Sequence, residues 1–548
     1  MERLEQLLKK IEKKNYRSYT SIKGQYDFTD FQLYIDNVQA DPFSPPTRVR
    51  VRRPWGLTDL AWLKECSEDY QRAARDYIAR FFHQLAEKEK SVSIDLTGQT
   101  ILDHTSVIFD DEAIELRFRV DLPADGRTIL AKKAINILTF YLPKFVRRAT
   151  IEREIPIDEL KRHCEIVEDQ VALRNQLAQH NLTAFVADGS TLPRTAGNCD
   201  LPMKEAITFK APESLAIELV TPHRGTVRGM GIPKGITLIV GGGFHGKSTL
   251  LTAIERSIYD HVPGDGREYI VSECNATKIR AEDGRCVHQL NLSNYINHLP
   301  MGRDTHCFTT QDASGSTSQA AWLQESIESG ASTILIDEDT SATNFMIRDE
   351  RMQALVSKGA EPITPLVDRI GQLRDQLDIS TIIVMGGSGD YLDIADTVIQ
   401  MHDYQPVDVT SRAKEVIIEH PSARHNEGSA DLLTPPARTL NLVGLQNQLQ
   451  EGKFRIQAKD TQSLRFGREY VDITALNQIE SSSQVHAAGW LWFQLAQNMG
   501  VESAPTQAFE ALLSGRWYDA MPNHGDLAKP RAIDVLAILN RMRKAEFL

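Results

Sequence analysis

Short apolar runs alternate with helix-like segments through the middle of the chain. These runs are bounded by turn residues and lie at Gly235–Val240, Glu268–Val271, Ser332–Ile336, Thr381–Met385 and Thr397–Met401. Continuous apolar runs of this length are typical of strands that are covered on both faces, with helices forming the connections. The pattern therefore predicts an α/β fold with a largely parallel core sheet, in a domain over residues 201–405.

The flanking regions mix helix and strand patterns. One face of a predicted N-terminal helix carries Leu4, Leu7, Leu8 and Ile11. Strands are predicted at Ser106–Phe109 and Ala113–Val120, a helix at Arg127–Leu142 that Pro143 ends, a helix at Pro156–Gln179 and a loop at Gly189–Pro202. We expect a mixed α/β domain at residues 1–200. A Pro- and Ser-rich loop at Pro421–Pro436 leads into a C-terminal α+β domain, which we place at residues 406–548.

The composition is that of a globular protein without membrane spans. Of the 548 residues 41% are hydrophobic and 25% charged, and six cysteines form no Cys-x-x-Cys pair. No apolar run approaches the roughly 18 residues that cross a bilayer. We therefore expect a soluble, cytoplasmic protein. The net charge of −12 argues against a surface coated with nucleic-acid contacts but leaves room for a local basic patch.

A complete phosphate-loop motif follows the first central strand. Residues 241–248 read Gly-Gly-Gly-Phe-His-Gly-Lys-Ser, behind the run Ile236–Val240 and ahead of a predicted helix. Backbone N–H groups and a helix N-terminus converge in such a turn, which suits a phosphate chain. Lys247 is expected to reach the β- and γ-phosphates of ATP, and the Ser248 hydroxyl to ligate Mg²⁺. The expected nucleotide-binding residues here are Gly241, Gly242, Gly243, Phe244, His245, Gly246, Lys247, Ser248 and Thr249, and Lys247 is also expected to be catalytic.

An acidic strand end supplies the second part of the site. The segment Thr333-Ile-Leu-Ile-Asp337-Glu338 has the form of a Walker B motif. Asp337 is expected to hold Mg²⁺ directly or through water, and Glu338 to polarise the attacking water. Many strands end in acidic residues for solubility alone. The position after a phosphate loop favours the catalytic interpretation.

A Ser-Gly turn indicates the subclass. Asp312-Ala-Ser314-Gly315-Ser316 precedes a predicted helix, Gln319–Ser329, which leads into the Asp337 strand. This order resembles the Ser-Gly-Gly-Gln signature of ABC-class ATPases, and the spacing to Asp337 matches their layout. The resemblance implies that Ser314, Gly315 and Ser316 face the γ-phosphate bound by a partner subunit, which makes the protein a homodimer. An ordinary Ser/Gly helix cap is the alternative.

The switch position departs from the ABC pattern. The strand Thr381–Met385 is followed by Gly387 and Ser388, where transporter cassettes carry a His. Ser388, which we include among the catalytic candidates, is able to contact the γ-phosphate but does not titrate. Hydrolysis then rests mainly on Glu338, and slow turnover is expected.

Two further ABC features have no clear counterpart. The segment Ser214–Val220 contains no adenine-stacking aromatic, and His223 is only a weak substitute. No Gln is assignable to the Q-loop. Glu282 and Asp283 stand in that region, and we interpret them as solvated loop charges.

The resemblance extends over nearly the whole chain. It is carried by Ile22-Lys-Gly-Gln-Tyr-Asp-Phe, Gln39-Ala-Asp-Pro-Phe, Arg48-Val-Arg-Val-Arg, Phe185-Val-Ala-Asp-Gly-Ser and Arg465-Phe-Gly-Arg-Glu-Tyr-Val-Asp. These segments are similar to those of the family known as predicted ATPases of the ABC class. That similarity implies a stand-alone ATPase with its own N- and C-terminal domains. An association with RNA, found for some relatives, is also suggested by it.

Two basic strands stand out in this acidic protein. Arg48, Arg50 and Arg52 alternate with valines, so a strand places the arginines on one face. Lys453, Arg455 and Lys459 repeat the pattern near the C-terminus. Rows of this kind suit a nucleic-acid backbone. A solvated strand face whose arginines pair with acidic side chains is the alternative, and the two are weighed about evenly.

Two functions fit these patterns. The first is an ATPase that uses ATP and Mg²⁺ at a site completed by dimerisation and coupled to RNA or another single-stranded nucleic acid. The second is a nucleic-acid-binding protein in which ATP acts mainly as a conformational switch. A transporter cassette is disfavoured by the two large flanking regions. The rate of ATP hydrolysis with and without nucleic acid distinguishes the first two.

Overall fold

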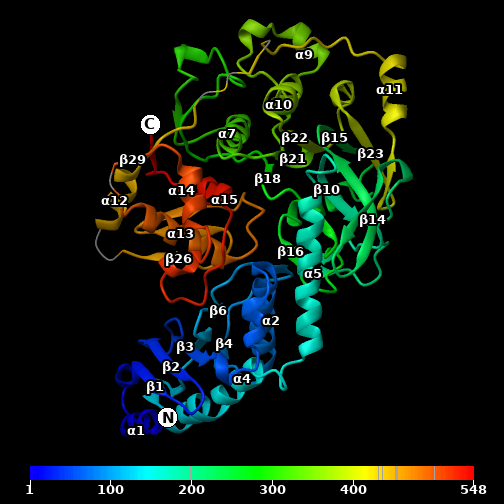
Figure 1. Ribbon diagram of the computed structural model, residues 1–548. Coiled ribbons are helices and arrows are strands. Elements are labelled where there is room, and N and C mark those ends of the chain that lie inside the picture. Colours follow the sequence, from blue (N-terminus) through cyan, green and yellow to red (C-terminus); the bar gives the residue numbers. More distant parts are fainter. Residues whose placement is uncertain (198, 430, 433, 435, 451–453, 499) are drawn as a thin grey trace. The chain divides into compact units, whose positions relative to one another are not determined.

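The computed structural model describes residues 1–548 except 198, 430, 433, 435, 451–453 and 499 (Figure 1). The chain forms two compact units. Unit 1 comprises Met1–Glu168 and Tyr518–Lys529, and unit 2 comprises Asp169–Trp517 and Pro530–Leu548.

Unit 1 is built on an antiparallel sheet with the strand order β1-β2-β3-β7-β4, and β6 also pairs with β7. Its strands are β1 (Gly24–Asp27), β2 (Gln32–Asn37), β3 (Thr47–Pro54), β4 (Val92–Ser93), β5 (Thr100–Ile101), β6 (Val107–Phe109), β7 (Ala113–Val120), β8 (Ala124–Asp125) and β9 (Thr128–Ile129). Its helices are α1 (Glu2–Lys10), α2 (Glu68–Ala86), α3 (Ala131–Ile135) and α4 (Leu142–Thr150), and α5 (Ile157–Gln176) leads into unit 2. The predicted strands and N-terminal helix are confirmed. Leu4 and Leu8 are buried as expected.

Two predictions for the flanking segments are wrong. Pro143 does not end its helix, because a π-helical turn at Asn136–Tyr141 carries α3 into α4. Proline is tolerated in a first helical turn, and a wider turn before it relieves the lost N–H hydrogen bond. The segment Gly189–Pro202 is not only loop, since it contains the antiparallel pair β11 (Arg194–Ala196) and β12 (Cys199–Pro202).

Unit 2 contains the predicted parallel core sheet, with the order β18-β21-β22-β15-β23-β24. The strands are β18 (Ala276–Ile279), β21 (Thr333–Asp337), β22 (Ser380–Val384), β15 (Ile236–Val240), β23 (Thr397–His402) and β24 (Gln405–Asp408). All neighbours are parallel except β24, which turns back against β23. The carboxyl ends of the parallel strands therefore share one edge, where ligands bind in open α/β sheets.

A second, antiparallel sheet has the order β13-β14-β10-β17. Its strands are β10 (Leu182–Ala187), β13 (Ala216–Thr221), β14 (Gly225–Pro233) and β17 (Ile270–Ser272). The run at Glu268–Val271 was expected in the parallel core, but β17 joins this sheet and β18 takes the core edge. Two short apolar runs so close together do not reveal which sheet each joins.

Helix α6 (Lys247–Arg256) packs between the two sheets. Its Leu250, Leu251 and Ile254 are in one buried cluster with core-sheet residues and with residues of β10 and β14. A helix covered by sheets on two sides must be apolar over much of its circumference, as this one is. Its N-terminus is thereby fixed at the end of β15.

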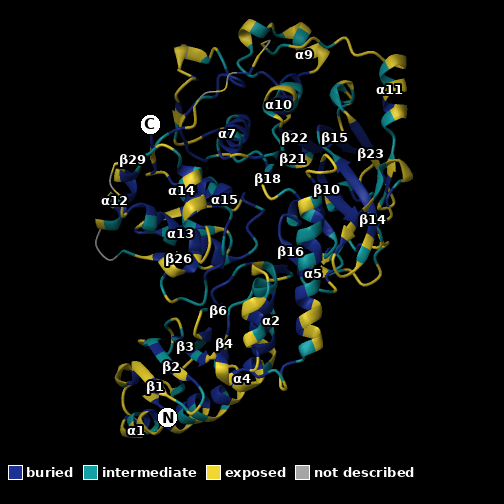
Figure 2. Ribbon diagram, viewed as in Figure 1, coloured by how far each residue is buried: buried dark blue, intermediate teal, exposed yellow. Residues whose placement is uncertain are grey.

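The C-terminal part of unit 2 has a small sheet, β26-β27-β28, that packs on a buried helix, α13. A Cβ built on Gly489 of α13 would lie 2.5 Å from the Ile456 Cγ2, so this side chain packs directly on the helix at the glycine. The bounds are β25 (Leu440–Asn441), β26 (Ile456–Ala458), β27 (Ser463–Phe466), β28 (Glu469–Asp472), β29 (Val501–Glu502), β30 (Glu546–Phe547), α12 (Leu442–Gln450), α13 (Ser482–Leu495), α14 (Pro505–Leu512) and α15 (Ala532–Leu539). Figure 2 shows α13 and the core strands as largely buried.

The remaining elements connect these layers. They are β16 (Asp260–His261), β19 (Val287–Leu290), β20 (Phe308–Thr310), α7 (Gly315–Glu328), α8 (Thr343–Met346), α9 (Glu350–Leu355), α10 (Ile370–Leu377) and α11 (Thr410–Glu419). Helix α7 packs on β18, and α10 packs on β22 and β15 (Figure 1). Helix α7 begins one residue after Ser314, as the sequence predicts within a few residues.

Candidate active site

The phosphate loop lies between β15 and α6, and its glycines have backbone conformations that larger residues avoid. Gly241 has a φ of 138°, and a Cβ there would lie 2.5 Å from the carbonyl oxygen of Met401. Gly246 has a φ of 93° immediately before the helix. The Lys247 ammonium donates to the carbonyl oxygens of Gly241 at 2.8 Å and Gly242 at 2.9 Å. The lysine thus spans the loop, with its charge where phosphates are expected.

A hairpin supports this loop from β23 and β24. The turn residues Asp403 and Tyr404 both have positive φ, 47° and 64°, which is the geometry of a tight two-residue hairpin turn. Tyr404 N–H donates to the His245 carbonyl at 3.1 Å, and Asp403 N–H donates to His245 Nδ1 at 3.0 Å. The His245 ring also stacks on His402, with 5.1 Å between centroids. The hairpin therefore fixes the loop, a contact that the sequence did not reveal.

Phe244 is the exposed tip of the loop. It has a φ of 65°, and 99% of its surface is exposed. A left-handed conformation costs a residue other than glycine about 1–3 kcal/mol. Strain of this kind is found where a loop is held for binding.

Glu338 is bound by the backbone after β22. Its Oε2 accepts hydrogen bonds from Gly386 N–H at 2.5 Å and Gly387 N–H at 2.9 Å. A Cβ built on Gly386 would lie 3.7 Å from Glu338 Oε2 and 3.9 Å from the Lys247 Nζ. The side chains of Glu338 and Lys247, which were predicted from separate motifs, therefore both lie next to Gly386. The role of Gly386 was missed, although the Gly-Gly-Ser-Gly run signals an unusual backbone.

Asp337 and Ser248 provide oxygen atoms suited to Mg²⁺. Asp337 ends β21 and is buried, and its Oδ1 accepts from Asp339 N–H at 3.2 Å. Ser248 is exposed in the first turn of α6. Carboxylate and hydroxyl oxygens are hard ligands, so this donor set fits Mg²⁺. The chemistry of the two residues agrees with the predicted site.

The Ser-Gly turn is placed at the start of α7. Ser314 is exposed, and its Oγ lies 3.1 Å from the Thr317 hydroxyl. Gly315 packs closely, because a Cβ there would lie 3.3 Å from Asp283. Ser316 points inward instead, and its hydroxyl donates to Asn344 at 2.7 Å. Of the three predicted residues, Ser314 is exposed, Gly315 is half-buried and Ser316 is engaged within the fold.

Gln319 joins α7 to the segment after the acidic strand. Its Oε1 accepts from Ala342 N–H at 2.8 Å, and its Nε2 donates to the Ser341 hydroxyl at 3.0 Å. Ser341 in turn donates to the Asp337 carbonyl at 2.8 Å. The helix that carries the Ser-Gly turn is thereby tied to the strand that carries Asp337.

Residues at the positions where the sequence departs from the ABC pattern also form hydrogen bonds within the fold. Ser388 lies 3.4 Å from Asp390 through a weak hydrogen bond. Ser214 donates to Asp408 at 2.7 Å. The interpretation of Glu282 as a solvated charge is wrong, since it accepts a hydrogen bond from the Arg541 guanidinium at 2.7 Å. A partner so far along the chain leaves no trace in the local sequence.

The N-terminal basic row lies on β3 as predicted, with valines buried and arginines on the other face. These arginines contact carboxylates of unit 1. Arg50 pairs with Asp36 at 2.6 Å and with Glu115 at 3.2 Å, and Arg52 pairs with Asp110 at 2.7 Å. These pairs correspond to the alternative interpretation of the row, in which the arginines pair with acidic side chains.

Arg48 completes this face, and its guanidinium contacts the His524 ring. The neighbouring strand adds Arg117 and Arg119, which pair with Glu115 and with Asp526, the latter at 2.5 Å. Positive and negative groups are therefore interleaved on this surface of unit 1.

The C-terminal basic row is more open. Lys453 lies outside the described residues, whereas Arg455 and Lys459 flank β26 and are exposed. Gln457, between them, faces Arg465 on β27, which faces Tyr470 on β28. Tyr470 is 68% exposed, and Arg465 stacks on its ring at 5.4 Å. No ion pair involves Arg455, Lys459 or Arg465 within the described part of the chain.

Comparisons with known proteins agree with this architecture. Three family models match successive parts of the chain: an N-terminal domain of ABC-class ATPases at residues 1–153, the P-loop domain of the ABC ATPase family at 156–438, and the MRB1590 C-terminal domain at 455–547. Because the P-loop model covers more than half of the chain, this protein belongs to the family of ABC-class ATPases. The family resemblance and the α/β fold predicted from the sequence are confirmed.

One curated relative supports the assignment. It is the uncharacterized protein MJ1628 of Methanocaldococcus jannaschii, 32% identical over 342 residues, or 60% of this chain and 73% of the relative. Two solved ATP-binding cassettes also align at 12% identity. MJ1267 of an ABC transporter, in its ADP conformation, has a TM-score of 0.25 and covers 43% of this chain and 96% of its own. The cbiO1 protein of Clostridium perfringens, part of the cbiONQ transporter complex, has a TM-score of 0.27 and covers 44% of this chain and 96% of its own. The assignment rests on the family models and the relative, not on these scores.

Among the described helices, none combines the length and the apolar character needed to cross a bilayer.

Proposed function

We propose that this ABC-class ATPase hydrolyses ATP at a site that two copies of the chain complete together, and that hydrolysis is coupled to single-stranded nucleic acid. The observation that carries the first part is the approach of Glu338 and Lys247 to Gly386. In this assignment Lys247 neutralises the β- and γ-phosphates, and Glu338 accepts a proton from the attacking water. Asp337 and Ser248 would hold Mg²⁺, which supplies charge neutralisation between the phosphates.

Dimerisation is supported by what the chain presents to solvent. The Ser314 hydroxyl and the Phe244 ring are both exposed. A phosphate-facing turn completed by a partner explains an exposed Ser-Gly helix start, and an apolar ring at the loop tip is suited to burial against that partner. We assign Gly241–Thr249 to the nucleotide of the same copy and Ser314 with Gly315 to the nucleotide of the other.

Turnover is proposed to be slow. Ser388 stands at the switch position and does not titrate, so Glu338 works without a neighbouring His. The same feature favours the second candidate function, in which ATP mainly switches the conformation of a nucleic-acid-binding protein. A measurable turnover number that nucleic acid raises favours the first, and tight ATP binding without turnover favours the second.

The nucleic-acid interface is proposed for the exposed face of β26, β27 and β28. Unpaired cations next to a stacking aromatic are what single-stranded nucleic acid requires. On this face Arg465 stacks on Tyr470, and the exposed Arg455 and Lys459 flank β26, the strand on the other side of β27. The arginines of β3 remain a weaker proposal, since each guanidinium already has a partner in unit 1. We further propose that the boundaries near residues 200 and 405 separate domains with distinct roles in a cytoplasmic protein.

The test compares wild type with Glu338→Gln. The variant should bind ATP and Mg²⁺ with near wild-type affinity. It should hydrolyse ATP at least about 100-fold more slowly, because the attacking water loses the carboxylate that accepts its proton. Trapped ATP should then accumulate a dimer in sizing experiments. Asp339→Asn, which alters an exposed carboxylate next in the chain, serves as the control with unchanged turnover. Equal turnover in wild type and Glu338→Gln would remove Glu338 from the mechanism.

A further inference from the structure

The loop after β18 contacts two parts of the proposed site. Ala281 N–H donates to the Thr340 carbonyl at 3.0 Å, in the segment after the acidic strand. Glu282 N–H donates to the Ser318 hydroxyl at 2.8 Å, and that hydroxyl donates to the Gly315 carbonyl at 2.8 Å. One loop therefore contacts both the Asp337 strand end and the Ser-Gly turn.

The same loop extends under the turn. Gly284 N–H donates to the Ala313 carbonyl at 2.8 Å, and Ala313 N–H donates to the Arg285 carbonyl at 2.9 Å. Arg285 is buried and donates twice to Glu325 of α7, at 2.7 and 2.8 Å. These paired bonds leave the residues before Ser314 little freedom to move independently of the loop.

Two arginines near the C-terminus bind this loop. Arg541 follows α15 in the chain. Its guanidinium donates to the Glu282 carboxylate, at 2.7 Å from Nη2 and 3.1 Å from Nε. It also stacks on Trp322 of α7 at 4.3 Å. The Arg541 side chain is 1% exposed, and burial lowers its pKa while the adjacent Glu282 carboxylate raises it. Arg543 adds bonds to the carbonyls of Gln311 at 2.5 Å and Gly284 at 3.1 Å.

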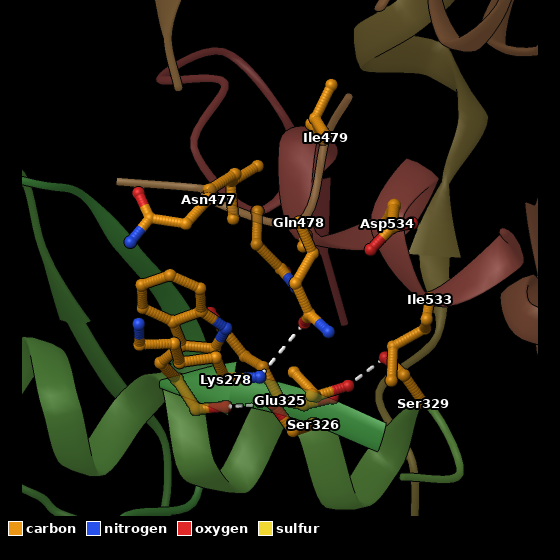
Figure 3. Close-up of a pocket in the computed structure, with 14 residues that line it drawn as sticks. Lys278, Glu325, Ser326, Ser329, Asn477, Gln478, Ile479, Ile533 and Asp534 are labelled. Atoms are coloured by element: carbon orange, nitrogen blue, oxygen red, sulfur yellow. Dashed lines mark hydrogen bonds between the residues drawn. The ribbon is translucent and has the colours of Figure 1, made fainter. Parts of the chain in front are cut away.

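The packing around these bonds is tight. Figure 3 shows α7, through Glu325, Ser326 and Ser329, facing Ile533 and Asp534 of α15, with Gln478 bonded to Lys278 of β18. The cavity between them is about 20 Å³, room for no more than a water molecule. Close-packed interfaces transmit displacement instead of absorbing it.

We propose that Glu282 and Arg541 are positioning residues, through which the C-terminal segment sets the place of the Ser314-Gly315 turn. The inference rests on the proposed role of that turn in ATP hydrolysis. Neither residue is among those that we assign to the phosphates. A shift of the C-terminal domain moves Arg541, then the loop that carries Glu282, and then Ser318 and the turn. Whatever binds the exposed face of β26–β28 thereby has a route to the hydrolysis step.

The experiment uses the full chain with Glu282→Gln and Arg541→Lys, alone and together. Glutamine removes the charge at nearly constant size, and lysine keeps the charge but loses the two-pronged geometry. We expect kcat to fall about tenfold, with ATP affinity changed less than about twofold, since the phosphate loop is intact. The double variant should be no worse than the more impaired single variant, because both break one interaction.

Amide hydrogen exchange provides a readout that needs no hydrolysis. The amides of Ala281, Glu282, Gly284 and Ala313 should exchange faster in both variants. Arg53→Gln is the control. It removes another buried arginine, which pairs with Asp30 at 3.3 Å within unit 1 and bonds to neither the loop nor the C-terminal segment. It should lower the melting temperature and leave kcat and these four amides unchanged.

The outcomes separate this proposal from the proposed function. Wild type without ATP turnover would contradict the proposed function, and the exchange data would still decide on the positioning residues. Unchanged exchange and kcat in both variants, or equal effects in Arg53→Gln, would overturn the positioning role. If a variant at the buried pair does not fold, Ser318→Ala cuts the connection while leaving the pair intact. The same loss of kcat and faster exchange at Glu282 is expected there, and wild-type behaviour would reject the proposal.

Discussion

The Glu338 carboxylate accepts a hydrogen bond from Gly387 N–H at 2.9 Å, and a Cβ on Gly387 would lie 2.7 Å from Glu338 Oε1. This position therefore excludes any side chain as long as Glu338 keeps its place. A glycine at the switch position does not replace the missing His as a titrating group. Together with Gly386 it holds the Glu338 carboxylate through backbone N–H groups.

Gly387→Ala should displace Glu338 and slow hydrolysis. A contact of 2.7 Å is shorter than a Cβ tolerates, so the Glu338 carboxylate must shift relative to its two N–H donors. We expect kcat to fall about tenfold or more, while ATP affinity stays near that of wild type. Gly389→Ala is the control, since a Cβ there meets nothing within 4 Å and its φ of −85° suits alanine. Equal kcat values in the two variants would show that the position of Glu338 does not limit the rate.

Lys247→Ala should weaken ATP binding itself. The ammonium is the cation that spans the loop, and hydrogen bonds from a charged donor contribute about 1.5–3 kcal/mol. The dissociation constant for ATP should rise about 10- to 100-fold in a direct binding measurement. Unchanged affinity would mean that the phosphates bind elsewhere. The exposed Lys414 of α11 supplies a control substitution to Ala with no expected effect.

The parts of this fold that the sequence predicted are those with local signals. The phosphate loop, the strand ending at Asp337 and the helix after Ser314 each follow from spacing and periodicity within a short segment. The prediction for Glu268–Val271 was wrong because strand pairing is decided by distant segments. Pro143 misled the helix prediction because a π-helical turn has no distinct sequence pattern.

The candidate site was predictable in its residues but not in its contacts. The sequence placed Glu338 and Lys247 in one site, whereas the support of Glu338 by Gly386 depends on tertiary structure. Glu282 was interpreted as a solvated charge because its partner, Arg541, stands near the far end of the chain. The roles of individual site residues remain predictions that the variants here are designed to test.

Ser314→Arg should impair hydrolysis while sparing initial ATP binding, since the turn acts on the nucleotide of the other copy. Mixing this variant with Glu338→Gln protein distinguishes a site shared between two copies from a site contained within one chain. In a mixed dimer one site carries both defects and the other keeps an intact Glu338 and Ser314. Random pairing in a two-fold dimer should then restore about a quarter of the wild-type activity. No recovery, with mixed dimers demonstrated, would indicate a site contained within one chain.

The two basic rows should differ in their effect on nucleic-acid binding. Changing Arg455, Lys459 and Arg465 together to Ala removes two exposed cations and one half-buried cation that have no ion-pair partner among the described residues. For single strands, each lost phosphate contact lowers the slope of log affinity against log salt by about 0.7, so a decrease of about 2 is expected. The buried Ile456 and Leu464 stay, so the sheet should still pack on α13.

The matched variant changes Arg48, Arg50 and Arg52 to Ala. These guanidinium groups already contact carboxylates or a histidine ring, so fewer of them are available to phosphates. The salt slope should change by less than about 1, and the melting temperature should fall because the buried Glu115 loses two of its ion-pair partners. Basal ATP hydrolysis should be retained by both triple variants. A larger change of slope for the β3 variant would move the interface to unit 1, and a wild type without salt-dependent binding to RNA or DNA would show that both rows are ordinary solvated faces.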